Sequence, residues 1–173
     1  TTMHKNRLGR YGVVTLHRPS NVDDSQVLAG IMNALNTIAE QLPLVFPIHP
    51  RTRDKLKALE VQPSERITLL GPQPYMEFLN LWKDATLVLT DSGGLQEETT
   101  ALGVPCLTLR HNTERPITVD EGTNTLVGTT AATITQAAQA ILQGHSKQGQ
   151  RPALWDGRAA ERIVQQLEIC LAS

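Results

Sequence analysis

Residues 11–48, which read YGVVTLHRPSNVDDSQVLAGIMNALNTIAEQLPLVFPI, contain one complete unit of strand, helix and strand. The apolar runs at 11–16 and 44–48 are nearly continuous, which is typical of strands that are covered on both faces of a sheet. Between them, apolar side chains recur at helical spacing, with Asp23 or Asp24 as the expected cap. This order predicts two parallel strands joined by a crossover helix.

The rest of the chain repeats this alternation of strand and helix. Further strands are expected at 67–70, 87–90, 105–109 and, more weakly, 125–127, and helices at 51–59, 75–84, 95–102 and 133–142. The sequence therefore predicts an α/β fold, a doubly wound sheet of about six parallel strands with helices on both sides. A polar linker at 144–152 and an amphipathic helix at 158–171 complete the expected order.

Composition excludes several classes of protein. The chain has 173 residues, a length suited to one domain, and a formal charge of -1, so no polybasic surface favours nucleic acid or an anionic membrane. It lacks both a run of about 18 apolar residues and a secretion signal, which makes the cytosol the expected compartment. Cys106, Cys170 and the five histidines show no spacing typical of disulfides or zinc ligands, so no metal and no cofactor is expected.

Ligands of doubly wound sheets bind where the strands end at their carboxyl edge. Polar residues crowd the loops that follow the predicted strands, at 17–21, 49–51, 71–75, 91–94 and 110–116. We therefore expect the functional site to be built from these loops.

The loop at 91–94, Asp-Ser-Gly-Gly, follows a buried strand and opens a helix. Gly93 and Gly94 would let backbone amides approach an anion, and Ser92 would add a hydroxyl at the positive end of the helix dipole. The alternative is a tight turn in which Ser92 only caps the helix. Glu98, further along this helix, either accepts the hydroxyls of a ribose or only complements the helix dipole. Neither a Gly-x-Gly-x-x-Gly motif nor a Gly-Lys-Ser/Thr motif is present.

Four further residues are candidates, each with an alternative. Arg115 could bind a diphosphate as a planar fork, or form a solvated surface pair with Glu114. Phe78 could contact a nucleotide base, or pack in the core. His17 could transfer a proton or pair with a phosphate, or be a structural histidine at a strand end, and the same alternatives apply to His49.

Several segments, in order, carry a resemblance to a known family: Thr15-Leu16-His17-Arg18 with Asn21, Thr90 to Glu98, Gly103-Val104-Pro105, Arg110 to Pro116, Leu126-Val127-Gly128 and Trp155 to Ala160. Together they resemble the C-terminal half of the non-hydrolysing UDP-N-acetylglucosamine 2-epimerases. The resemblance extends over nearly the whole chain from about residue 11. Its most specific part is the combination of Asp-Ser-Gly-Gly-x-Gln-Glu-Glu with Thr-Glu-Arg-Pro.

The resemblance implies a Rossmann-like domain that is one half of a GT-B-type enzyme. Residues 11–173 would be its C-terminal UDP-binding domain and residues 1–10 a hinge or an expression-derived segment, with the N-terminal catalytic domain absent from this chain. The full enzyme would interconvert UDP-N-acetylglucosamine and UDP-N-acetylmannosamine by eliminating UDP and adding it back, for cell-surface polysaccharide biosynthesis. Its partners would be the UDP-sugar substrate and its own N-terminal domain, with a homodimer as a plausible assembly. We expect this chain alone to bind UDP weakly and to be inactive.

The resemblance also assigns roles to the candidates. It implies that the diphosphate is bound by Ser92, Gly93, Gly94 and Arg115, the ribose by Glu98 and the uracil near Phe78, with His17 as a catalytic residue. In some relatives Arg18 and His49 would touch a second, activating UDP-sugar. Ser20, Ile117 and Pro50-Arg51 depart from the family pattern, so allosteric activation is not carried over.

Two other functions remain as alternatives. A UDP-sugar-dependent glycosyltransferase of the same two-domain fold would also place UDP on its C-terminal sheet, but the pairing of residues 96–98 with 113–116 disfavours it. A non-catalytic nucleotide-sugar sensor would need only the binding domain.

Overall fold

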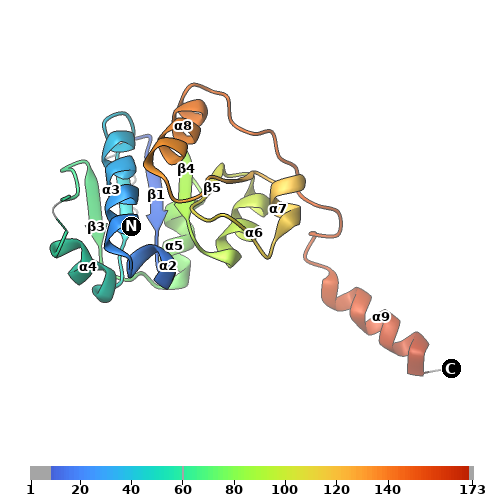
Figure 1. The fold of residues 1–173 in the computed structure, drawn as a ribbon. Coiled ribbons are helices and arrows are strands. Elements are labelled where there is room, and N and C mark those ends of the chain that lie inside the picture. Colours follow the sequence, from blue (N-terminus) through green and yellow to red (C-terminus); the bar gives the residue numbers. More distant parts are fainter. Residues whose placement is uncertain (1–8, 60, 172–173) are drawn as a thin grey trace.

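The computed structural model describes residues 9–59 and 61–171, which form a six-stranded parallel sheet with helices on both faces (Figure 1). The strands are β1 (Gly12–Thr15), β2 (Leu44–Pro47), β3 (Ile67–Leu70), β4 (Leu87–Thr90), β5 (Cys106–Thr108) and β6 (Asn124–Leu126). Their order is β3-β2-β1-β4-β5-β6, and every neighbouring pair is parallel. The predicted doubly wound fold is confirmed, and the strand order reverses its direction between β1 and β4, where such sheets bind ligands.

The helices are α2 (Pro19–Val22), α3 (Ser25–Ala39), α4 (Pro50–Lys57), α5 (Tyr75–Trp82), α6 (Gly93–Leu102), α7 (Pro116–Asp120), α8 (Ala131–Leu142) and α9 (Ala159–Leu171). The expected helices are confirmed to within a few residues, and Asp24 is the cap of α3, accepting from the backbone N–H groups of Gln26 and Val27. Helix α6 begins two residues earlier than predicted, so both glycines lie in its first turn. Two short helices, α2 and α7, replace expected loop, and each begins at a proline, which suits a first helical turn.

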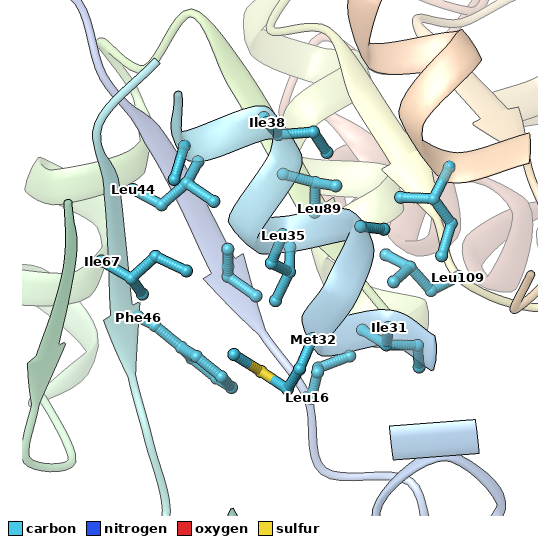
Figure 2. Packing of buried hydrophobic residues seen from close by; sticks show 14 of the residues in the cluster. Leu16, Ile31, Met32, Leu35, Ile38, Leu44, Phe46, Ile67, Leu89 and Leu109 are labelled. Carbon is cyan, nitrogen blue, oxygen red and sulfur yellow. The ribbon is translucent and has the colours of Figure 1, made fainter. Parts of the chain in front are cut away.

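Both faces of the sheet are covered by apolar side chains. On β2, Leu44 and Phe46 point into one cluster, while Val45 between them points into the other. Figure 2 shows the first cluster, in which Leu35 of α3 and its neighbours pack against the strands. The second cluster lies under α5 and α6 and contains the fully buried Trp82. This double burial explains why the strands read as continuous apolar runs.

The predicted linker at 144–152 is polar, as expected, but it is attached to the domain. Gln150 N donates to the carbonyl of Glu121 at 2.8 Å, and Arg151 donates to the carbonyl of Ala101. The Gly149 backbone lies so close to Gly122 that an added Cβ would come within 2.4 Å of it. The linker therefore has a defined path along the α6–α7 side.

Helix α9 is amphipathic, as predicted, but extends away from the sheet (Figure 1). None of its residues is buried, and Ile163, Val164, Leu167 and Leu171 are each at least 52% exposed. In the part of the chain that the structure describes, no helix is both long enough and apolar enough to cross a bilayer. Residues 1–8, most of the predicted hinge or added segment, lie outside the described residues.

Candidate functional site

Two adjoining hollows open at the carboxyl edge of the sheet. The first has a volume of about 250 Å³, and its lining includes Tyr75, Ser92, Gly94, Leu95 and Glu98. The second has a volume of about 210 Å³, and its lining includes Pro47, His49, Pro72 and Gln73. Thr15, His17 and Phe78 line both hollows. The loops after β1, β2, β3 and β4 thus meet here, as their positions in the sequence predict.

His17 is held by a buried carboxylate. Its Nδ1 lies 2.8 Å from Oδ1 of Asp91, whose side chain has no exposed surface. Asp91 also accepts from the backbone N–H groups of His17 and Arg18 and from the side-chain amide of Asn21. The hydrogen bond to Asp91 raises the pKa of His17, in spite of partial burial, which acts in the opposite direction. With Nδ1 engaged, Nε2 is the ring nitrogen left to a ligand.

Sequence reasoning did not identify Asp91 as the partner of His17. It read this residue only as the first member of the Asp-Ser-Gly-Gly turn. A signal existed, because the carboxylate of an aspartate directly after a buried strand needs hydrogen-bond partners close by. The loop after β1, the strand beside β4, is a nearby source of such partners.

The first turn of α6 contains the Ser-Gly-Gly segment. Ser92 is the N-cap, with its Oγ 3.5 Å from the backbone N of Leu95, as the structural alternative predicted. An added Cβ at Gly94 would meet nothing within 4 Å, and one at Gly93 would meet only Oε2 of Glu114 at 3.9 Å. Neither glycine has a positive φ, so neither packing nor backbone conformation of this chain requires glycine here. First-turn amides also lack intrahelical acceptors, which leaves this turn able to bind an anion.

Glu98 lies on the wall of the first hollow. Tyr75 Oη donates to Glu98 Oε1 at 3.2 Å, and the charge of Glu98 raises the pKa of Tyr75. Phe78, one turn further along α5, is only partly buried: it packs against the second apolar cluster and also lines the first hollow. Tyr75 lies in the expected 71–75 loop but received no role from the sequence, since a tyrosine at a helix start carries no signal for its partner on another helix.

Arg115 forms no ion pair with the Glu114 carboxylate, so the alternative of a surface ion pair between them is wrong, although Arg115 Nη1 donates to the Glu114 backbone carbonyl at 3.2 Å. Its Nε lies 2.9 Å from Oε1 of Glu97 on α6, and the side chain is 42% exposed. Glu114 instead accepts from both terminal nitrogens of Arg110, at 2.7 and 2.9 Å. This double hydrogen bond lowers the pKa of Glu114 to about 2. Arg115 is not among the residues lining the first hollow, although its ion pair holds it against the first turns of α6.

The two residues expected at a second ligand lie apart. His49 lines the second hollow and caps α4, where its Nδ1 accepts from the backbone N of Arg51 at 3.3 Å. Arg18 lines a different hollow, together with Arg110 and His111, and donates to the Asp91 carbonyl at 3.1 Å. The two hollows do not share a lining residue.

Gln96 is a further residue that the sequence reading left without a role. Its side chain is completely buried and makes three hydrogen bonds, which connect α6 with the loop after β5 and with β6. Within residues 9–59 and 61–171, no group of three or more His, Cys, Asp and Glu side chains could hold a metal ion.

Comparison with known proteins gives consistent matches. The family model described as UDP-N-acetylglucosamine 2-epimerase matches residues 1–168. The UDP-N-acetylglucosamine 2-epimerase of Methanocaldococcus jannaschii is 41% identical over 160 residues, covering 89% of this chain and 43% of that protein. A Pseudomonas aeruginosa protein named UDP-2,3-diacetamido-2,3-dideoxy-D-glucuronate 2-epimerase is 38% identical over 156 residues, covering 90% and 43%.

A solved structure shows the same relation. The crystal structure of the M. jannaschii UDP-GlcNAc 2-epimerase in complex with UDP-GlcNAc and UDP matches with a TM-score of 0.83 and 38% identity. The match covers 97% of this chain and 48% of that one. The chain thus spans about half the length of the relatives it matches.

Proposed function

This chain belongs to the UDP-N-acetylglucosamine 2-epimerase family, and we propose that it forms the UDP-binding domain of an enzyme that interconverts UDP-N-acetylglucosamine and UDP-N-acetylmannosamine. The reaction removes the proton from carbon 2 and eliminates UDP from carbon 1, and then adds UDP back together with a proton on the opposite face of carbon 2, which inverts that carbon. The observation that carries this proposal is the hollow at the first turn of α6, where His17, Glu98 and the Ser-Gly-Gly turn face one space.

The positions of these groups support a specific pose of UDP. The amides of Gly93 and Gly94 and the hydroxyl of Ser92 bind the phosphates at the positive end of α6. Glu98 lies six residues beyond Ser92, which is about 9 Å along the helix axis and suits the distance from phosphates to ribose hydroxyls. Phe78 lines both hollows, so a base placed between them would lie against its ring.

The proposed chemistry assigns the leaving diphosphate to this domain. Elimination builds negative charge on UDP, and a cation positioned beforehand stabilises such charge most effectively. His17, held by Asp91 with a raised pKa, supplies that cation through Nε2. Arg115 supplies a second cation once its guanidinium leaves Glu97 and binds a phosphate oxygen. This exchange is feasible because a guanidinium can form paired hydrogen bonds with a carboxylate or with a phosphate.

We assign the proton transfer at carbon 2 to the other half of the enzyme. The relatives are roughly twice as long as this chain. In the proposed pose, Glu98 on the wall of the hollow accepts hydrogen bonds from the ribose and is therefore not free to act as a base. The missing half would place its own acids and bases over the sugar. The chain alone would then bind UDP without epimerising, and measurable turnover by this chain would contradict the division.

Calorimetric titration with UDP, UMP and uridine tests the binding site. We expect a preference for UDP, and Arg115→Ala should reduce UDP affinity by about tenfold or more while leaving uridine unaffected, because it removes a charge-assisted hydrogen bond. Ser92→Ala should weaken UDP less. Arg66→Ala, which removes an exposed arginine next to β3, is the matched control. Unchanged UDP affinity in both Ser92→Ala and Arg115→Ala would refute the site.

A further inference from the structure

The buried side chain of Gln96 joins two segments that are distant in sequence. Its Nε2 donates to the carbonyl of Ser92 at 3.0 Å, on the turn that opens α6. Its Oε1 accepts from the hydroxyl of Thr113 at 2.6 Å, on the loop that follows β5. Asn124 Nδ2 donates to the same oxygen at 3.0 Å, which fills the second acceptor position.

The link continues to the backbone of Arg115. Thr113 Oγ1, which donates to Gln96, also accepts from the backbone N of Arg115 at 2.9 Å. An uninterrupted chain of hydrogen bonds therefore runs from the Ser92 carbonyl to the Arg115 amide. These are the two segments to which the diphosphate is assigned.

We propose that Gln96 is a positioning residue that fixes the spacing between the Ser92 turn and the Arg115 loop, and thereby makes the site select a diphosphate over a monophosphate. This inference rests on the proposed function and adds a source of specificity to it. A diphosphate needs both segments at a fixed separation, whereas a monophosphate can be satisfied by the helix turn alone. Rigid spacing therefore benefits UDP more than UMP, and uridine not at all.

The position uses both ends of the Gln96 amide. It must donate to a carbonyl and accept from two donors at once, which a carboxylate and an apolar side chain cannot do. Gln96 is completely buried, so water does not replace a lost partner. Loss of the amide should therefore loosen the link between the two segments.

The test uses Gln96→Met, which keeps the length of the side chain and removes its hydrogen bonds, and Thr113→Val, which cuts the same chain at its second member. In calorimetric titrations, each variant should lower the preference for UDP over UMP by about tenfold while changing uridine affinity by less than about twofold. Thr113→Ser keeps the hydroxyl and should restore the preference. The double variant should be little worse than either single one, because both cut one connection.

Thr99→Val is the matched control. Thr99 is completely buried on the same helix, and its hydroxyl donates to the carbonyls of Leu95 and Gln96 and also interacts with the thiol of Cys106. None of these groups belongs to the chain of hydrogen bonds that runs from the Ser92 carbonyl to the Arg115 amide. Thr99→Val should lower thermal stability without changing the UDP-to-UMP ratio. The inference is wrong if the parent chain prefers UDP and both Gln96→Met and Thr113→Val keep that preference. A parent chain that does not bind UDP would instead overturn the proposed function itself, and this inference with it.

Discussion

Nδ1 of His17 lies 2.8 Å from Oδ1 of Asp91, and the carboxylate of Asp91 is completely enclosed by the protein. The same carboxylate receives two backbone N–H groups from the turn that holds His17. One buried anion therefore fixes both the ring and the backbone beneath it. This arrangement favours the protonated imidazole and directs its second nitrogen away from Asp91.

Asp91→Asn should lower the pKa of His17 toward its ordinary value of 6.5, because the hydrogen bond to Asp91 is the main cause of the raised pKa. Titration of the His17 ring signals by NMR measures the change. Glu98→Gln removes the charge of another carboxylate that lines the same hollow, and it should leave the pKa of His17 unchanged. A His17 pKa that is the same with and without Asp91→Asn would contradict the assignment.

The same pair predicts how stability depends on pH. The pKa of His17 is higher in the folded chain than the unfolded value of 6.5, so folding favours the protonated form. The stabilisation is fully present below pH 6.5 and is lost as the pH rises through the folded-state pKa. Urea unfolding across this range should show the decline, and Asp91→Asn should flatten it.

Gly94→Ala should separate folding from binding. The added Cβ meets nothing within 4 Å, so the free energy of unfolding should stay the same or rise by up to about 1 kcal/mol. UDP affinity should fall by about tenfold, because the methyl group occupies space next to the phosphates. Gly30→Ala in α3 is the control, since its added Cβ also meets nothing within 4 Å. It should change the free energy of unfolding by a similar amount and leave UDP affinity unchanged. Normal UDP binding by Gly94→Ala would show that the phosphates lie elsewhere.

Gly122→Ala should destabilise the domain by about 1–3 kcal/mol through overpacking. Its Cβ would come within 2.4 Å of the Thr100 hydroxyl and 2.6 Å of the Thr118 carbonyl, and a backbone atom cannot move aside cheaply. Denaturant unfolding provides the measurement. Gly71→Ala, where an added Cβ meets nothing within 4 Å, should unfold like the parent chain.

Substitutions on α9 should leave the domain intact. Ile163→Ser and Leu167→Ser together should change the free energy of unfolding by less than about 0.5 kcal/mol, since neither side chain is buried. Leu35→Ala in α3, which removes a completely buried side chain, should cost about 2–5 kcal/mol in the same assay. A large loss from the α9 changes would mean that this helix packs on the domain in solution.

The sequence predicts the centre of the sheet well because β1, β2 and β4 are apolar on both faces, and short apolar runs bounded by turn residues are typical of buried parallel strands. Helices α2 and α7 escape prediction because four or five residues are too few to show a helical period. The edge that gathers the candidate residues is also predictable, since it follows from strand direction alone.

Partners across elements are what the sequence does not reveal. Arg115 pairs with Glu97 rather than with its neighbour Glu114, because the loop after β5 passes beside α6. The same holds for Gln96, whose polar character at a helical position reads as surface but is satisfied by Thr113 and Asn124. Such pairings depend on packing between distant segments, which no local pattern records.

The order of the strands has a consequence for synthesis on the ribosome. Of these six strands β1 and β2 are made first, but the other edge of β1 has no partner until β4, which ends at Thr90, has been made. Helix α3 likewise gains its neighbour α8 only after residue 142 has been translated. While this domain is being made, one edge of β1 therefore stays unpaired and α3 lacks its contact with α8. The turn around His17 also has no carboxylate to bind until Asp91 has left the exit tunnel.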